Sequence, residues 1–319
     1  MSDMVWLVGD IGGTNARFGL VTPDGTLRHT NTYAVGDYPR FDDALAAYLE
    51  QRGDLPKPKI GCVAIAAQVT GDQVRMTNHP WNFTTTAVRD RLGFDRFIAI
   101  NDFTAVALAV PRLQGGDRMQ VGGGTAVDGT PIGVLGPGSG LGVSGLIRAG
   151  EHYTALSGEG GHSTMPAAND RENAVLARMR QHFDHVSAER CLSGPGLVNL
   201  YNSLAAVDGV PAASYSAAQI TDPETAAADP LCREAAAMFC AMLGTVAGNL
   251  ALTLGAKGGV YIAGGIVPRF GTAFTQTEFR SRFEAKGRLS PFLAAIPTYV
   301  VTHKLPAFLG CTAALAMPG

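Results

Sequence analysis

The chain begins with two short apolar stretches separated by a glycine-rich segment. Residues 5–9 and 17–21 have the length and side chains of strands, and residues 11–15 lie between them. Two strands joined by a short turn with glycines are typical of a β-hairpin. Further strands are expected at residues 30–35, 59–66 and 73–76.

The first helix is predicted from apolar residues at helical spacing. Five of them fall on one face: Phe41, Ala44, Leu45, Tyr48 and Leu49. Asp37 is the expected N-cap of this helix, and Pro39 suits its first turn.

A second helix is expected at residues 84–92, followed by a buried strand at 97–100. A third helix, at residues 102–110, begins directly after that strand, and Pro111 is expected to end it. Asp102 therefore lies where a strand ends and a helix begins.

The strand–turn–strand pattern recurs in the middle of the chain. Residues 132–135 and 142–147 are expected strands, and the glycine-rich turn 136–140 lies between them. Two such units suggest an ancient duplication with a ligand held between the halves. From residue 169 onward the chain is mostly helical. Strands at 259–263 and 298–302 and an Ala-rich helix close it.

Composition and charge exclude several classes of protein. In the 319 residues, 46% are hydrophobic and 16% are charged, which is typical of a globular chain of about two domains. The net charge of −2 and the lack of a long basic run argue against nucleic acid as a partner. Five scattered cysteines without a CxxC pair indicate buried thiols rather than zinc ligands or disulfides.

One segment has the length of a membrane span. Residues 235–254 carry no charge, and Gly244 and Gly248 form a GxxxG motif. The segment also contains Thr245, Asn249 and Thr253, so a helix buried inside a soluble domain fits better. No signal peptide is visible at the N-terminus, and a cytoplasmic protein is expected.

Glycines are unusually common and occur in clusters. There are 40 of them, or about 12.5% against roughly 7% in an average protein. Neither GxxxxGK[ST] nor the Rossmann pattern GxGxxG occurs in its required context. The segments 10–15 and 136–142 instead offer runs of amide groups without bulky side chains. Such runs can converge on phosphate oxygens, although each could also be an ordinary hairpin turn.

The motifs resemble those of a known family. Asp10-Ile-Gly-Gly-Thr-Asn-Ala-Arg17 resembles the first phosphate loop of bacterial glucokinases, which belong to the hexokinase and actin-like ATPase superfamily. Residues 135–143 resemble their second phosphate loop, and residues 259–268 their adenosine segment. Segments at 77–81, 100–103, 158–162 and 187–194 resemble their glucose site, in the same order along the chain. The Cys-rich zinc loop of the related repressor and kinase group is missing, so the resemblance is to the zinc-free branch.

The resemblance implies an α/β, actin-like (ribonuclease H-like) fold with duplicated domains and a central cleft. The expected domains are a small one at 1–112, a large one at 113–302, and a C-terminal helix, 303–319, that returns to the small domain. ATP and Mg²⁺ are the implied cofactors, without structural zinc. A homodimer is also implied.

The resemblance assigns the nucleotide site residue by residue. The nucleotide-binding residues it implies are Asp10, Gly12, Gly13, Thr14, Asn15, Gly138, Ser139, Gly140, Gly264 and Gly265. Asp10 sits at a strand end, where a carboxylate can hold Mg²⁺ through water. Gly264 and Gly265 would let the adenine ring lie against bare backbone.

Asp102 is the expected catalytic base of a phosphoryl transfer to glucose. From its position alone it could equally be the N-cap of the helix that follows. The expected sugar-binding residues are Asn78, Asn101, Asp102, Gly138, Glu159, His162 and Glu189. His162, Glu189 and Asn78 could each instead be a surface or turn residue. His79 and Pro80 depart from the family pattern, and residues 302–310 match it only loosely.

Other functions remain open at this stage. The acceptor could be mannose, fructose, N-acetylglucosamine or an acid, and the donor could be ADP or polyphosphate. A sugar-binding regulator without catalysis is another alternative. Glu159 and Glu189 could also suggest a glycoside hydrolase, but such an enzyme would not need two phosphate loops.

Overall fold

The structure, a computed structural model, describes residues 4–67, 69–76, 81–150 and 152–317. The chain divides into two compact units. The first comprises residues 1–113, 152–157 and 303–319, and the second comprises residues 114–151 and 158–302. The C-terminal helix thus groups with the N-terminal third of the chain.

The first unit is built on a five-stranded sheet in the order β3-β2-β1-β4-β8. Its strands are β1 (Trp6–Ile11), β2 (Asn15–Val21), β3 (Leu27–Ala34), β4 (Ile60–Ile65) and β8 (Arg96–Asn101). β1 is antiparallel to β2 and parallel to β4, and β4 is parallel to β8. The predicted N-terminal hairpin is therefore confirmed, with Asp10 opposite Arg17 in its register.

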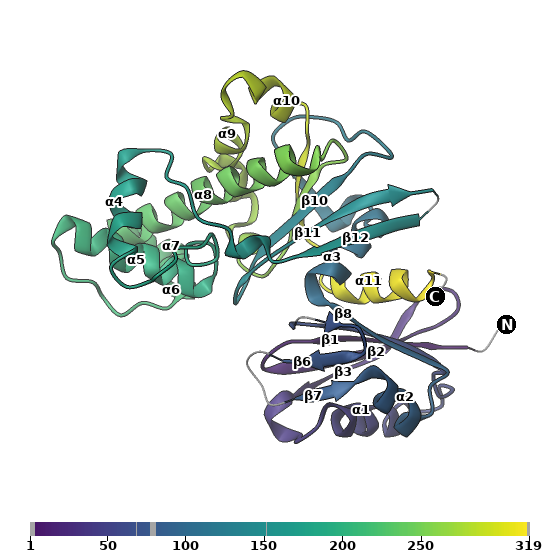
Figure 1. Ribbon diagram of the computed structural model, residues 1–319. Helices are drawn as coiled ribbons and strands as arrows, with labels where there is room; N and C mark the ends of the chain where they lie inside the picture. Colours follow the sequence, from purple (N-terminus) through teal and green to yellow (C-terminus); the bar gives the residue numbers. More distant parts are fainter. Residues whose placement is uncertain (1–3, 68, 77–80, 151, 318–319) are drawn as a thin grey trace. The chain divides into compact units, whose positions relative to one another are not determined.

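Helices cover both faces of this sheet (Figure 1). On one face lie α1 (Phe41–Glu50) and α2 (Thr85–Leu92), and on the other lie α3 (Asp102–Ala109) and α11 (Pro306–Leu315). α3 and α11 approach so closely that a Cβ on Gly310 would lie 1.8 Å from the carbonyl oxygen of Ala105. A small sheet of β5 (Val69–Thr70), β6 (Gln73–Arg75) and β7 (Asn82–Thr84) completes the unit.

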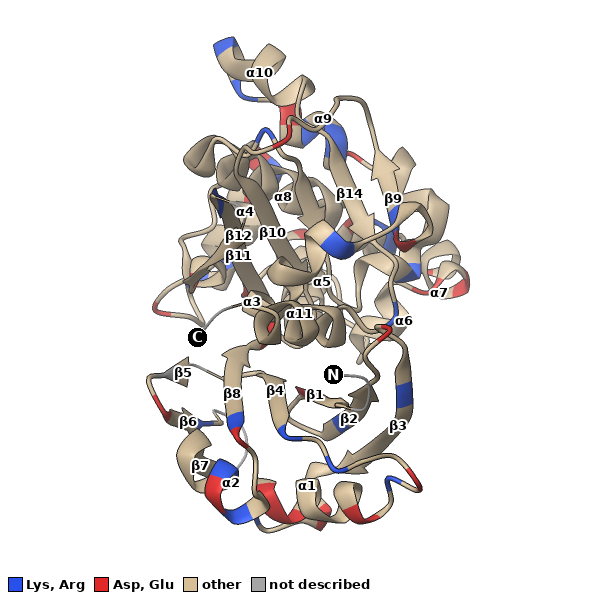
Figure 2. Ribbon diagram, turned by 90° about the vertical axis from the view of Figure 1, so that its right-hand side faces the viewer, with Lys and Arg blue, Asp and Glu red and all other residues tan. Residues whose placement is uncertain are grey.

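Charged residues are frequent along α1 and α2 (Figure 2). Arg91 of α2 pairs with Asp42 and Asp43 in the first turn of α1, which joins the two helices. The predicted N-cap Asp37 is wrong. It ends a 3₁₀ turn, and α1 begins at Phe41 without a side-chain cap. Tyr38 precedes a proline and is extended, so a helix cannot start before that proline.

The second unit has the same strand pattern. β11 (Leu141–Ala149), β10 (Ile132–Pro137), β13 (Val260–Ile262) and β14 (Thr298–Val301) follow one another in its sheet, and β9 (Arg118–Val121) lies beside β14. β10 is antiparallel to β11 and parallel to β13, and β13 is parallel to β14. This order repeats β2-β1-β4-β8, so the inferred duplication is visible in the sheets. β12 (His152–Gly158) follows β11 along the chain, and its residues 152–157 group with the first unit.

A long central helix, α8 (Pro230–Leu254), organises the helical part of the second unit. Around it in sequence are α4 (Asp170–Met179), α5 (Gly194–Asp208), α6 (Ala217–Ile220), α7 (Pro223–Ala228), α9 (Phe279–Glu284) and α10 (Ser290–Ala294).

α8 has the length and apolar composition of a membrane span, but 67% of its most apolar part is buried inside the protein. Cβ atoms on Gly244 and Gly248 would lie 2.1 and 2.6 Å from the carbonyl oxygens of Phe279 and Phe283. The GxxxG motif therefore packs α8 against α9 within the unit.

Candidate active site

The first glycine turn, between β1 and β2, presents two consecutive backbone amides. The Gly12 amide donates to the Asn15 carbonyl at 2.9 Å, which closes the turn, and the Val35 amide donates to the Thr14 carbonyl at 2.9 Å. The amides of Gly13 and Thr14 have no acceptor in the described part of the chain. Two adjacent N–H groups of this kind suit a phosphate oxygen.

The fold itself does not require glycine at this turn. A Cβ on Gly13 would meet nothing within 4 Å, and one on Gly12 would meet only the Asn15 carbonyl oxygen at 3.6 Å. Neither residue has a positive φ. The lack of a side chain at these two positions leaves room for a close approach to the backbone amides of the turn.

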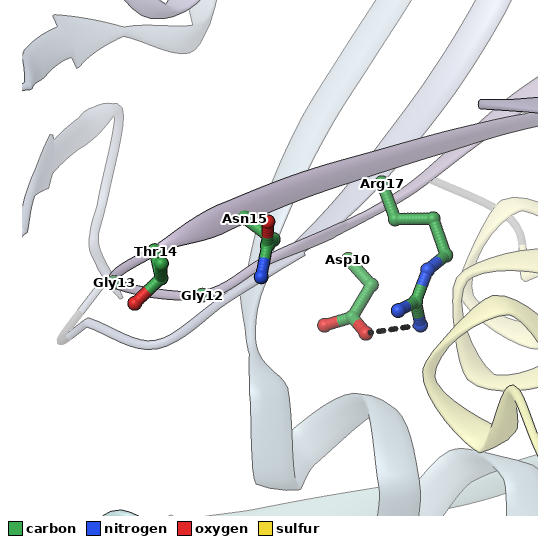
Figure 3. Close-up of a pocket in the computed structure, with 6 residues that line it drawn as sticks. All are labelled: Asp10, Gly12, Gly13, Thr14, Asn15 and Arg17. Carbon is green, nitrogen blue, oxygen red and sulfur yellow. Dashed lines mark ion pairs between the residues drawn. The ribbon is translucent and has the colours of Figure 1, made fainter. Parts of the chain in front are cut away.

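A cavity of about 250 Å³ opens at this turn. Six residues line it: Asp10, Gly12, Gly13, Thr14, Asn15 and Arg17. Figure 3 shows the side chains of Asp10 and Arg17 turned toward one another beside the turn, with Asn15 next to them. All five residues expected here for nucleotide binding thus share one cavity, and Arg17 joins them.

Asp10 is held in a setting that disfavours its charge. Burial raises the pKa of its carboxyl above the usual 3.8, and the positive charge of Arg17 partly offsets this. The Arg17 guanidinium lies 3.7 Å from the carboxylate, and the two side chains keep 36% and 37% of their surface exposed. A carboxylate in such surroundings gains from a further cation.

The residues present fit a magnesium ion bound together with a nucleotide. No group of three or more His, Cys, Asp and Glu side chains in the described residues could hold a metal by itself. Mg²⁺ in phosphoryl-transfer enzymes is commonly held by one or two carboxylates, waters and the substrate's phosphates. Asp10 is the carboxylate that would hold it, and the ion would neutralise phosphate charge.

The second glycine turn, between β10 and β11, is closed in a similar way. The Gly138 amide donates to the Gly140 carbonyl at 2.8 Å, and the Gly194 amide donates to the Gly138 carbonyl at 2.8 Å. Ser139 and Gly140 then present the amides that have no acceptor in the described residues. A Cβ on Gly138 would meet nothing within 4 Å, as at Gly13.

The expected adenosine segment adjoins this second turn. The Ala263 amide donates to the Leu135 carbonyl at 2.8 Å, so the segment continues from β13 alongside β10. Gly264 has a φ of +84°, and its Cβ would lie 2.4 Å from the Pro137 carbonyl oxygen. The fold therefore requires glycine at 264. Gly265 has open space, which leaves its backbone accessible.

Asn101, and not Asp102, is the N-cap of α3. Its side-chain oxygen accepts from the amides of Phe103 and Thr104 at 2.9 and 3.1 Å, and its Nδ2 donates to the Ala67 carbonyl at 3.3 Å. Asp102 is the first residue of the helix, half-buried, and its Oδ1 accepts from the Phe103 amide at 2.9 Å. The carboxylate thus lies at the N-terminus of α3.

Four of the expected sugar-binding residues lie in the second unit: Gly138, in the second glycine turn, and Glu159, His162 and Glu189. Glu189 is half-buried, while Glu159 and His162 are exposed. The Glu189 amide donates to the Gly161 carbonyl at 2.9 Å, so the structure brings Glu189 beside the 159–162 turn. Asn78, together with His79 and Pro80, lies outside the described residues.

Two features were not predicted from the sequence. The sequence alone did not indicate the ion pair of Arg17 with Asp10, which follows from the hairpin register that places the two residues opposite one another. The second feature is the hydrogen bond from the Leu141 amide, directly after the second turn, to Oε2 of Glu189 at 2.8 Å; it joins residues 48 positions apart, so no local sequence signal could have indicated it.

Comparison with known proteins agrees with this geometry. The family model for glucokinase matches residues 7–318. The chain is 51% identical over 319 residues to a glucokinase of Paramagnetospirillum magneticum, covering 100% of this chain and 99% of the relative. The chain belongs to the glucokinase family. The resemblance seen in the sequence motifs is thereby confirmed.

Solved structures agree on the fold of this glucokinase-family chain. A glucokinase from an Antarctic psychrotroph is 35% identical, with a TM-score of 0.89 and 98% of each chain covered. A ROK-family glucokinase from Streptomyces griseus, 19% identical, has a TM-score of 0.65 and covers 98% of this chain and 99% of its own. The expected actin-like ATPase fold is confirmed.

Proposed function

We propose that the chain transfers the γ-phosphoryl group of ATP directly, in line, to the 6-hydroxyl of glucose, giving glucose 6-phosphate and ADP. The observation that carries this proposal is the full-length 51% identity to a relative named glucokinase. The two glycine turns and the strand-end carboxylates Asp10 and Asp102 supply the parts that such a reaction needs: phosphate donors, a metal ligand and a group that orients the acceptor.

Asp102 is the proposed catalytic base. Its carboxylate accepts a hydrogen bond from the acceptor hydroxyl and directs the oxygen at the γ-phosphorus. A bond forms between that oxygen and phosphorus as the bond to the leaving ADP oxygen breaks. Because the carboxylate is a weak base for an alcohol, the proton moves to Asp102 late in the step. The Asn101 cap fixes the start of α3 and thereby the position of Asp102.

The glycine turns are the proposed binding sites for the nucleotide phosphates. The amides of Gly13, Thr14, Ser139 and Gly140 donate to phosphate oxygens, and the hydroxyls of Thr14 and Ser139 add two donors. Asp10 would hold Mg²⁺ through water, and Gly264 and Gly265 would leave bare backbone for the adenine.

The sugar hydroxyls are the proposed partners of Asn78, Asn101, Glu159, His162 and Glu189. Carboxylates accept from pairs of neighbouring hydroxyls, while the amide groups and the imidazole can also donate. A site with several such groups rejects sugars that leave one of them unpaired.

The cellular location, the domain boundaries and the oligomeric state of the protein are also proposals. All five cysteines are buried free thiols, which suits a reducing cytoplasm. The proposed domains, 1–112 and 113–302 with 303–319 returning to the first, follow the resemblance, as does a homodimer. Light scattering coupled to size-exclusion chromatography measures the assembly directly.

The function is tested by ADP release over a panel of acceptors. Glucose, mannose, fructose and N-acetylglucosamine are compared at equal concentrations with ATP, and 6-deoxyglucose serves as an acceptor without the reacting hydroxyl. We expect glucose to give the highest kcat/KM and 6-deoxyglucose to release no ADP above the sugar-free rate. A higher kcat/KM with another sugar would assign that sugar as the acceptor. A lack of turnover with all of the sugars would contradict the proposal that the protein is a sugar kinase.

A further inference from the structure

Glu189 contacts the second phosphate turn directly. One carboxylate oxygen, Oε2, accepts from the Leu141 amide at 2.8 Å. The same oxygen would lie 2.5 Å from a Cβ on Gly140, so glycine at this position makes room for the carboxylate. Leu141 is the first residue of β11, immediately after the turn amides of Ser139 and Gly140.

The backbone around Glu189 is itself held firmly. Its amide donates to the Gly161 carbonyl at 2.9 Å, and its carbonyl accepts from the Ser193 hydroxyl at 2.8 Å. The neighbouring Ala188 and Cys191 are buried in the core of the unit. The backbone that carries the carboxylate is therefore tied down by hydrogen bonds on both sides and by buried neighbours.

The same support holds the turn at its other side. The Gly194 amide, one residue after Ser193, donates to the Gly138 carbonyl at 2.8 Å. The segment from Glu189 to Gly194 therefore makes two hydrogen bonds to the turn. One joins the backbones of Gly194 and Gly138, and the other joins the Glu189 carboxylate to the Leu141 amide. Of these two ties, only the second depends on a side chain.

We propose that Glu189 is a positioning residue for the second phosphate turn, holding the Ser139 and Gly140 amides in their nucleotide-binding arrangement. This inference rests on the proposed function, because it takes the turn as a phosphate site. Oε1 makes no hydrogen bond within the described residues, so one oxygen serves the turn and the other serves a sugar hydroxyl. Binding of sugar and of nucleotide is then coupled through one carboxylate.

The test compares two neutral substitutions that differ in one respect. Glu189→Gln keeps an oxygen that can accept from the Leu141 amide, whereas Glu189→Leu has none. Both remove the same negative charge, so their difference isolates the hydrogen bond. We expect Glu189→Leu to bind the magnesium complex of a non-hydrolysable ATP analogue about tenfold more weakly than Glu189→Gln without sugar, measured by calorimetry.

A second experiment tests the same inference in case the Glu189→Leu variant does not fold. Gly140→Ala places a methyl group against Oε2, so it should weaken analogue binding in the wild-type background and have little effect beside Glu189→Ala. Equal analogue affinity of the Gln and Leu variants, or the same Gly140→Ala effect in both backgrounds, would overturn the inference. A wild-type chain that binds no analogue would overturn it too. Failure of the proposed function would be distinguishable from this, because the wild-type protein would then bind the ATP analogue but would not turn over ATP and glucose.

Discussion

The carboxylate of Asp10 lies 3.7 Å from the guanidinium of Arg17, directly across the first hairpin. Burial raises the pKa of Asp10 even with this partner. A charged carboxyl with a raised pKa destabilises the folded state, because the unfolded chain holds the charge at lower cost. The destabilisation of the folded state by the charged Asp10 thus occurs at a position where a bound metal ion would remove it.

Asp10→Asn should therefore stabilise the metal-free chain at pH 7 while weakening its use of Mg²⁺. The gain in melting temperature should shrink as the pH falls through the raised pKa toward 3.8, where Asp10 becomes protonated. Melting curves from pH 4 to 7 without metal and nucleotide measure the first effect, and Mg²⁺ titration of kcat/KM measures the second. A variant with unchanged Mg²⁺ dependence would remove Asp10 as the metal ligand.

Gly13→Ala should leave the fold intact and impair nucleotide binding. The added methyl group meets nothing within 4 Å in the chain, so the melting temperature should stay the same or rise slightly. The methyl group would occupy the space of a phosphate, and we expect the KM for ATP to rise about tenfold or more. Gly36→Ala is the matched control, since its Cβ also has open space but lies outside the cavity. Equal effects of the two changes would contradict the phosphate assignment.

Asn101→Ala should lower both stability and turnover. It removes the acceptor of the Phe103 and Thr104 amides, and loss of such a cap costs about 1 kcal/mol. Asn101→Asp keeps an acceptor there and should retain most of the stability, as urea denaturation can show. If Asn101→Ala unfolds at the same urea concentration as the wild type, the cap does not contribute as described.

Glucose should make the protein more compact in solution. The chain passes between its two units four times, after residues 113, 151, 157 and 302. Exclusion of water from the reacting phosphate limits hydrolysis of ATP, so closure on the sugar is expected of this reaction. Small-angle scattering with and without saturating glucose measures it, with 6-deoxyglucose as a second ligand. An unchanged radius of gyration would argue against closure.

Local patterns predicted much of the fold. The β1–β2 hairpin, the presence of α2 and the β8–α3 junction follow from short apolar runs and nearby turn residues. The start of α1 was missed because Pro39 restricts Tyr38, an effect that competes with the capping preference of Asp37.

The site was predicted less completely, for a physical reason. Gly12, Gly13 and Gly138 could be placed in turns from the sequence because a turn is a local pattern, and their binding role stays a prediction. The tie between Glu189 and Leu141 joins residues 48 positions apart, and only the folded chain reveals it. The assignment of the α3 cap to Asn101 rather than Asp102 likewise depends on backbone angles.

The turnover of Asp102→Asn tests the central claim most directly. Asparagine keeps the size of the side chain but cannot take the proton, so we expect kcat to fall at least about 10²-fold while glucose affinity is largely kept. Asp95→Asn, at an exposed site before β8, is the matched control and should turn over like the wild type. Near-normal kcat in Asp102→Asn would contradict the account.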